Sequence, residues 1–200
     1  MNAILQSLAS LYPLATHFIM DKYKKEINKV NILGYKGRIA DQFGLVMKGL
    51  WRGSFKYLRP DLFRREIAEC KYEFASSKQQ DAQELLLFLL DGLHEDLNQV
   101  KDRRYIEEKV FKIKIFRNNP FFKDANGRPD DEVAQESWEN HRRLNKSIIV
   151  DLFQGQFKNT LKCLSCKYTS VKFDAFMFLS LPIPEKVSSD FEKKIGKRLF

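Results

Sequence analysis

The sequence predicts an α+β fold in which a block of helices is followed by the first strands of a β-sheet. Apolar residues recur at helical spacing through most of residues 1–100, whereas the alternation typical of strands appears mainly after residue 147. Hydrophobic residues make up 44% of the 200 residues and include 17 Phe, so the chain can bury a sizeable core. Charged residues make up 30%, which is typical of folded rather than disordered proteins.

The first helices follow from apolar spacing and from the positions of proline. Residues 1–19 carry one apolar face, and Pro13 divides them into a helix and a second short turn. Residues 21–36 are polar and predict a loop. Residues 37–51 predict an amphipathic helix, and a further helix over residues 60–70 opens with a proline, which suits a first helical turn. The shared apolar face of the amphipathic helix comprises Ile39, Phe43, Val46, Met47, Leu50 and Trp51.

The strongest helical pattern begins just after residue 80 and runs to about Val100. Either Ser76 or Ser77 is predicted to cap this helix, because a Gln stands three residues after each of them. The longest apolar run of the chain, residues 85–90, lies within it and predicts a buried helix face. The residues expected to point inward are Ala82, Leu85, Leu86, Leu89, Leu93 and Leu97.

The second half of the chain predicts short strands separated by turns. Residues 118–129 are rich in turn-forming residues, and residues 138–144 predict a helix. Residues 110–116 alternate apolar with basic residues and predict an edge strand. Residues 157–161 and 168–181 alternate in the same way on either side of a cysteine pair, and the second of them ends near Pro182.

The charge, taken alone, suggests a nucleic-acid partner. The net charge is +9, and basic residues gather in residues 22–36 and 101–117. Acidic residues are mixed into both groups, and aromatic residues are not interleaved with the basic runs, so we interpret them as solvated faces. No apolar run approaches the roughly 18 residues of a membrane span, and there is no secretory signal. We therefore expect an intracellular, cytoplasmic protein, with an endosomal or nuclear pool possible.

The chain contains four segments in one order, residues 1–8, 79–86, 147–156 and 163–184. Together they resemble segments of the ubiquitin-specific proteases, which are cysteine peptidases of the ubiquitin carboxyl-terminal hydrolase type. Residues 1–8 resemble the segment just after the family's nucleophile, and residues 79–86 resemble its second signature. Residues 147–156 are similar to the segment that leads into its β fingers. Residues 163–184 are similar to the first half of its zinc ribbon and the strand beyond. Residues 91–98 and 144–166 resemble most the family's UBPY-like branch.

The resemblance implies a papain-like cysteine protease hand made of a helical thumb, β fingers and a β palm. Residues 1–146 would form the helical thumb, and residues 147–200 would begin the fingers and palm. The implied reaction is hydrolysis of the bond after the C-terminal glycine of ubiquitin, and the implied partners are ubiquitin and ubiquitinated proteins. The implied reaction proceeds through a thioester that forms on a cysteine thiolate.

The resemblance assigns no catalytic residue within this chain. The family's Cys stands two residues before the position that matches Met1, and its His belongs to a segment beyond Phe200. The chain as given is therefore expected to be truncated at both ends of the catalytic domain and inactive. Two origins would give such a sequence. One is a gene model that starts at an internal methionine, Met1, and the other is a catalytically dead pseudoenzyme that binds ubiquitin. We interpret the three histidines as surface or partly buried helix residues; they are His17, His94 and His141.

Two acidic residues of the second signature are candidate ubiquitin contacts. Asp81 and Glu84 lie three residues apart in the first turns of a helix, so their carboxylates share one face. Taken alone, this pattern favours simple stabilisation of the helix dipole. The resemblance instead implies that they bind the basic tail of ubiquitin through charge-assisted hydrogen bonds. By the same resemblance, Gln79 and Gln80 are expected to contact the tail or a neighbouring loop.

Cys163 and Cys166 have the spacing of two ligands of a structural zinc ion. The second pair of ligands that the family uses would lie beyond Phe200, and no cofactor is expected for catalysis. Reduced thiols in a β turn are the alternative, because three cysteines without a secretory signal suggest a reducing compartment. A basic nucleic-acid-binding module with a zinc knuckle is a further alternative, which the order of the four segments disfavours.

Overall fold

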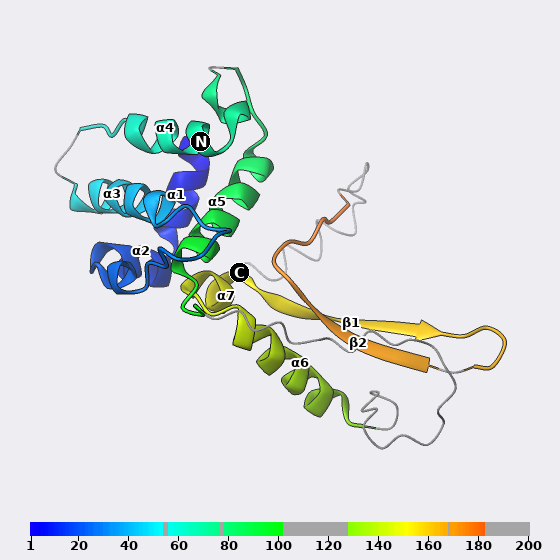
Figure 1. Ribbon diagram of the computed structural model, residues 1–200. Coiled ribbons are helices and arrows are strands. Elements are labelled where there is room, and N and C mark those ends of the chain that lie inside the picture. The colour runs from blue at the N-terminus through cyan, green and yellow to red at the C-terminus, as the bar shows by residue number, and fades with distance from the viewer. Residues whose placement is uncertain (54–55, 77, 102–127, 168, 183–200) are drawn as a thin grey trace, which may run out of the picture.

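The computed structural model describes residues 1–53, 56–76, 78–101, 128–167 and 169–182, and it divides into a helical block and an extended arm (Figure 1). The helical block contains α1 (Asn2–Ser10), α2 (Tyr12–Ile19), η1 (Lys22–Lys25), α3 (Arg38–Arg52), α4 (Asp61–Cys70), η2 (Tyr72–Ala75) and α5 (Ala82–Leu97). After it come α6 (Asp130–Leu144), α7 (Ile148–Phe153), β1 (Gly155–Lys162) and β2 (Thr169–Phe176). Helices followed by a small sheet confirm the predicted α+β composition, while the thumb and finger assignment stays a prediction.

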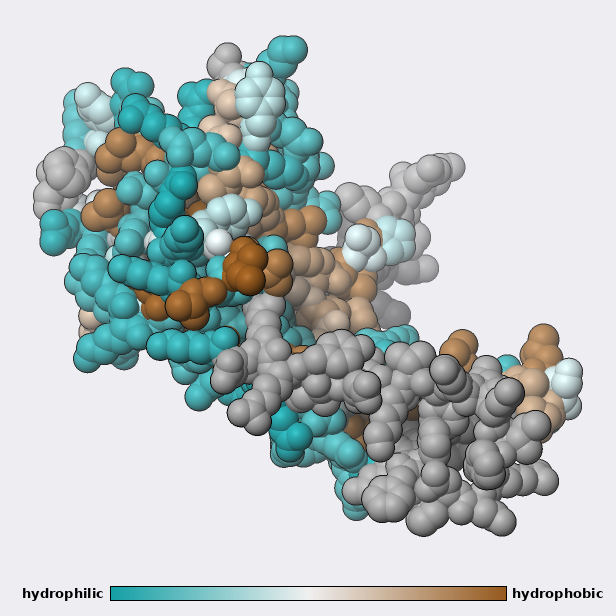
Figure 2. Space-filling model, viewed as in Figure 1, coloured by the Kyte–Doolittle hydropathy of each residue, from teal (hydrophilic) through white to brown (hydrophobic). Residues whose placement is uncertain are grey.

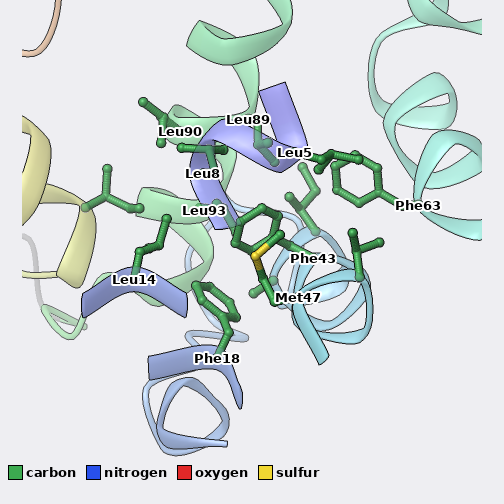
Figure 3. Close-up of a cluster of buried hydrophobic side chains, with 14 of the residues drawn as sticks. Leu5, Leu8, Leu14, Phe18, Phe43, Met47, Phe63, Leu89, Leu90 and Leu93 are labelled. Carbon is green, nitrogen blue, oxygen red and sulfur yellow. The ribbon is translucent and has the colours of Figure 1, made fainter. Parts of the chain in front are cut away.

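The helical block closes around one apolar core, to which each of its five α-helices contributes (Figure 3). Phe18 of α2 and Phe43 of α3 meet edge to face with ring centroids 4.8 Å apart. Burying one such side chain stabilises the fold by roughly 1.5–3 kcal/mol. The side chains labelled at the centre of the core are Leu5, Leu8, Leu14, Phe18, Phe43, Met47, Phe63, Leu89, Leu90 and Leu93.

The predicted helices are confirmed over most of the block, and the differences occur at faces and ends. Pro13 stands near the start of α2, and the helical conformation is interrupted at Leu11, as the position of the proline predicted. Trp51 is 47% exposed rather than buried, because its indole nitrogen donates to the Ala9 carbonyl at 3.0 Å at the rim of the core. Ala82 is also exposed, since it occupies the first turn of α5, and α5 ends at Leu97 rather than at Val100.

A buried carboxylate near the end of α5 begins α3. Asp96 is 0% exposed and accepts four backbone N–H groups, from Tyr35 at 2.7 Å, Gly37 at 3.0 Å, Ile39 at 3.1 Å and Ala40 at 3.2 Å. Gly37, at the N-cap position of α3, has φ +88° and no side chain to cap the helix. Burial raises the pKa of Asp96, and these hydrogen bonds oppose that rise. The N-terminus of α3 is thus capped from a distant part of the sequence.

The arm consists of α6 and the antiparallel pair β1–β2, whose register runs from Gly155 opposite Phe176 to Lys162 opposite Thr169. The Ser137 hydroxyl of α6 donates to a carbonyl of β2 at 2.8 Å. Neither α6 nor the two strands contain a buried residue. The strand predicted over residues 110–116 and most of the turn-rich segment 118–129 lie outside the described residues.

The helical block and the arm meet at His94, which the sequence predicted to be a surface or partly buried helix residue and which is instead buried. His94 is only 5% exposed, with Nδ1 at 2.8 Å from the Ser147 hydroxyl and Nε2 at 3.2 Å from Asn145 Oδ1. Ser147 also caps α7, a short helix that the sequence pattern did not predict, by accepting from Val150 N. His17 and His141 are partly buried, as predicted. Among the described helices, none is long and apolar enough to cross a membrane.

Candidate functional site

The candidate site is a cleft of about 580 Å³ at which α1 and α5 both begin. Its walls come from the start of α1, the start of α4, the segment after η2 and the start of α5. The lining residues are Met1, Asn2, Pro60, Asp61, Arg64, Phe74, Ser76, Lys78, Gln79, Gln80, Asp81, Ala82 and Leu85. Three of the four predicted ubiquitin-binding residues therefore share this cleft with the first residues of the chain.

Asp81 caps α5. Its Oδ1 accepts from the backbone N–H of Gln83 at 2.7 Å and of Glu84 at 3.4 Å. The prediction that Ser76 caps this helix is therefore wrong, because Ser76 lies too far before α5. Ser77, the other predicted cap, lies outside the described residues. Ser76 instead accepts from Lys78 N at 3.3 Å and from the Gln80 side-chain amide at 3.1 Å. Asp81 thus stabilises the start of the helix, as the sequence pattern taken alone predicted, and it remains exposed at the cleft.

Glu84 points to a different partner from the one predicted. Its carboxylate pairs with the Lys71 ammonium, which also lies 3.1 Å from Glu73. The hydrogen bond from Lys71 lowers the pKa of Glu84, and Glu84 in turn raises the pKa of Lys71. Glu84 is not among the residues that line the cleft. No local sequence pattern indicates that Lys71 and Glu84 form an ion pair, so sequence reasoning did not identify Lys71 as a residue that affects the site.

The helices α1, α4 and α5 all begin at the cleft, and its lining includes the charged residues Asp61, Arg64, Lys78 and Asp81. The first turn of α1 contains no acidic residue, and no side chain caps it. Its backbone N–H groups and dipole therefore favour negative charge at its start. This end of a helix lowers the pKa of a thiol placed there. The starts of α4 and α5, in contrast, carry the carboxylates of Asp61 and Asp81, so the cleft combines one helix end without an acidic residue and two acidic helix ends.

A second, smaller cleft adjoins the first. It has a volume of about 330 Å³ and shares Asn2 and Pro60 with it. Its other described walls come from α1, the end of α3 and the segment before α4. These are Leu5, Gln6, Val46, Gly49, Leu50, Gly53, Lys56, Tyr57 and Leu58. Their convergence depends on helix packing, and no motif indicated it.

The predicted metal pair lies far from the cleft, in the turn that joins β1 to β2 (Figure 1). Cys163 and Cys166 are both exposed, and Cys163 Sγ accepts from Cys166 N at 3.5 Å. That hydrogen bond is the main cause that lowers the pKa of Cys163, which favours the thiolate that binds metals. The two thiols fit half of a tetrahedral zinc site. Among the described residues no cluster of three or more His, Cys, Asp or Glu side chains completes it.

The remaining cysteine and two histidines are engaged elsewhere. Cys70 is half-buried, and burial raises the pKa of its thiol. His17 lies 3.0 Å from Glu26, and His141 lies 2.7 Å from Gln154. These contacts suit structural roles better than a nucleophile with its general base.

Comparisons with known proteins agree with the four segments. A sequence model of the family described as "Ubiquitin carboxyl-terminal hydrolase" matches residues 1–195. Ubiquitin carboxyl-terminal hydrolase 4 of Bos taurus is 47% identical over 186 residues, which are 93% of this chain and 18% of that protein. Ubiquitin carboxyl-terminal hydrolase 15 of Homo sapiens is 44% identical over 192 residues, which are 96% of this chain and 18% of that protein. The chain thus spans about a fifth of the length of these curated relatives, and their names do not test the UBPY-like branch.

Proposed function

The chain belongs to the ubiquitin carboxyl-terminal hydrolase family, as the four segments predicted, and from this premise we propose that its 580 Å³ cleft receives the C-terminal tail of ubiquitin. The protein would then be part of a deubiquitinating cysteine peptidase. That peptidase hydrolyses the isopeptide or peptide bond after the C-terminal glycine of ubiquitin, inside the cell.

One observation carries the proposal: the starts of α1 and α5, 80 residues apart in sequence, line the same cleft. A thiolate just before α1 would stand at an uncapped helix N-terminus, where the dipole favours its charge. Gln79, Gln80 and Asp81 would lie along the same cleft and hold the tail. A tail held there would present its final carbonyl carbon to the thiolate, which forms a thioester and expels the amine.

Asp81 and Glu84 would contribute in different ways. Asp81 caps α5 through Oδ1. Because Asp81 is exposed and lines the cleft, its carboxylate charge is available there for a basic residue of the tail. Glu84 is held by Lys71 in the structure and would have to exchange this partner for an arginine of the tail. Exchange is feasible because 43% of the Glu84 side chain is exposed.

The test uses a longer protein that includes residues 1–200 together with the segments that carry the family's Cys and His. Asp81→Asn keeps an N-cap oxygen for α5, since Asn and Asp cap equally well. Asp81→Asn and Glu84→Gln should each lower kcat/KM for a fluorogenic ubiquitin substrate by roughly ten- to a hundredfold, through loss of a charge-assisted bond of about 1.5–3 kcal/mol. The melting temperature should change little.

Asp131→Asn is the matched control, because Asp131 stands in the first turn of α6 and outside the cleft. Replacing the arginines of the ubiquitin tail should add little further loss to the Asp81 and Glu84 variants, since the ion pair is already broken. A kcat/KM close to that of the parent protein in both variants would reduce Asp81 and Glu84 to helix-stabilising residues.

For residues 1–200 by themselves we propose ubiquitin binding without turnover. Their three cysteines and three histidines stand at no catalytic position of the family's motifs. A thiol-reactive ubiquitin probe that specifically labelled Cys70, Cys163 or Cys166 would contradict this. If the longer protein also failed to turn over substrate yet bound ubiquitin, the alternative of a pseudoenzyme would hold. A nucleic-acid-binding module would instead bind RNA or DNA with a steep dependence on salt.

For the cysteine pair we propose half of a structural zinc site. Cys163 and Cys166 would supply two thiolates, and a second pair outside residues 1–200 would supply the other two. Zinc bound to the longer protein should amount to about one ion per chain by elemental analysis. Cys163→Ser with Cys166→Ser should release it. Unchanged zinc content in that double variant would place the metal elsewhere.

A further inference from the structure

The loop before α3 exposes large aliphatic side chains on a tight turn. Gly34 N donates to Asn31 O at 3.3 Å, so Ile32 and Leu33 occupy the two corner positions of the turn. Ile32 is 96% exposed, Leu33 63% and the preceding Val30 68%. Turn corners usually carry Gly, Pro, Asn or Asp, whose backbone preferences and side-chain polarity suit them. Folding therefore gives no reason for two aliphatic residues there.

The turn is held rigidly, so its apolar side chains are kept in solvent. Asn28 is 2% exposed; its Oδ1 accepts from Val30 N at 3.2 Å and Asn31 N at 3.1 Å, and its Nδ2 donates to Asn98 O at 2.7 Å. Asn31 Nδ2 donates to the backbone oxygen of Glu95 at 2.8 Å. A Cβ at Gly34 would meet that same oxygen at 3.0 Å. The turn is thus preorganised against the end of α5.

Lysines occur on both sides of the turn in the sequence. Lys29 and Lys36 flank it in sequence, and Lys22, Lys24 and Lys25 form most of η1 immediately upstream. The acidic side chains nearby in sequence are already engaged. Glu26 pairs with His17, and Asp21 with Lys24 and Lys48.

The Glu95 carboxylate accepts from the Asn31 side-chain amide at 2.6 Å, so this acid is hydrogen-bonded to the turn. In the part of the chain that the structure describes, no carboxylate lies within 4.0 Å of the ammonium of Lys22, Lys25, Lys29 or Lys36. Figure 2 shows brown side chains on the mostly teal face of the helical block, where Figure 1 draws this loop.

We propose that the Asn31–Gly34 turn inserts Ile32 and Leu33 into an anionic lipid surface, with Lys22, Lys25, Lys29 and Lys36 against the lipid phosphates. An apolar tip with lysines on both sides of it in the sequence complements such a surface in polarity and charge. The tip protrudes, and neither of the two clefts is lined by residues 22–36. A bilayer closes around a protruding tip, whereas a protein partner would need a pocket made for it.

The two contributions are individually weak and act together. Each lysine near an anionic surface strengthens binding by about fivefold, and burial of aliphatic groups adds to this. The inference does not depend on how the ubiquitin tail binds, because the turn lies outside the cleft.

The test is flotation of the 200-residue chain with two kinds of vesicle. One is made of phosphatidylcholine alone, and the other contains phosphatidylserine at about 30%, enough to give the surface a negative potential. We expect several-hundredfold stronger partition onto the anionic vesicles, because four lysines at about fivefold each multiply to roughly 600-fold. Ile32→Asn with Leu33→Asn should reduce that partition at least about tenfold, through loss of the buried aliphatic groups. Both replacements suit turn corners, so folding is preserved, which circular dichroism checks.

Leu161→Asn is the matched control, since Leu161 is an equally large aliphatic side chain that is 76% exposed on β1. It should leave partition unchanged. Lys29→Gln with Lys36→Gln should weaken binding to the anionic vesicles about twentyfold, in line with about fivefold for each lysine.

Three results would overturn the proposal. The first is the absence of binding to anionic vesicles, which would mean that the turn contacts a protein partner instead. The second is binding that the lysine changes abolish and the Ile32–Leu33 changes spare, which would mean surface charge alone. The third is a concentration-dependent dimer, seen by analytical ultracentrifugation, that the Ile32–Leu33 variant dissolves; the occupant would then be a second copy of the chain.

Discussion

The helical block and the arm have ordered secondary structure for different reasons. Every buried hydrophobic residue of the described chain lies in the helical block or in α7, and none lies in α6, β1 or β2. The helix α6 is instead favoured by charges that complement its dipole. Three acids stand in its first turn and His141, Arg142 and Arg143 in its last.

The comparison shows that regular secondary structure and tertiary stability have separate sources. A two-stranded ribbon is marginally stable in water unless another surface covers it. In the arm, Phe157 and Phe176 stack with ring centroids 3.7 Å apart, yet Phe157 remains 36% exposed. The helical block should therefore carry nearly all of the free energy of unfolding, and the arm should depend on further contacts.

The largest effect is expected from Phe43→Ala, in the core of the helical block. Phe43 is 0% exposed, so the change should lower the free energy of unfolding by about 3–5 kcal/mol. Urea unfolding followed by helical circular dichroism measures it. The same change at Phe157 of the arm should cost less than about 1 kcal/mol, because its ring is already partly in water. Equal losses at the two positions would break the comparison.

The next effect is expected at Asp96, which holds α3 from the end of α5. Asp96→Ala should cost roughly 2–4 kcal/mol, because it leaves buried N–H groups at the start of α3 without an acceptor. Hydrogen exchange should show α3 opening before α5. Asp91→Ala is the control, since Asp91 lies exposed on α5 and should change stability by less than about 0.5 kcal/mol. A similar loss in both variants would mean that any acid of α5 serves equally.

A smaller difference is expected between the thiols of the two regions. Hydrogen bonds from Cys166 lower the pKa of Cys163 in the arm, whereas burial raises the pKa of Cys70 in the helical block. At neutral pH, iodoacetamide should therefore modify Cys163 roughly tenfold faster than Cys70, because the thiolate is the reactive form. Peptide mass spectrometry over time measures both rates. Faster modification of Cys70 would mean that the helical block opens more readily than the arm.

The smallest effect is expected at the ion pair beside the cleft. Lys71→Met releases Glu84, so the affinity of the chain for ubiquitin should rise by about two- to fivefold, as expected for removing one exposed competitor. Isothermal titration calorimetry measures it. Lys158→Met removes a comparable pair with Asp130 in the arm and should leave ubiquitin affinity unchanged. A gain in both variants would point to overall charge rather than to Glu84.

Local regularities of the sequence predicted most of the described helices and both strands, but not η1, η2, α7 or the first half of α6. Leu85, Leu89 and Leu93 recur at helical spacing and are buried as predicted, because helical periodicity is a property of neighbouring residues. The order of the four segments determined the family. The cysteine pair was likewise placed correctly between two strands, since strand alternation on each side of it is local.

Only the tertiary structure decided which distant groups meet. Asp96 and His94 stand near the polar end of an otherwise ordinary helix, and nothing nearby indicates that one caps α3 and the other bonds to Ser147. Lys71 and Glu84 pair because η2 folds back beside α5. The clefts at the start of α1 arise in the same way. Such contacts depend on which helix faces pack together, and that is settled by burial of the whole core rather than by any segment of the sequence.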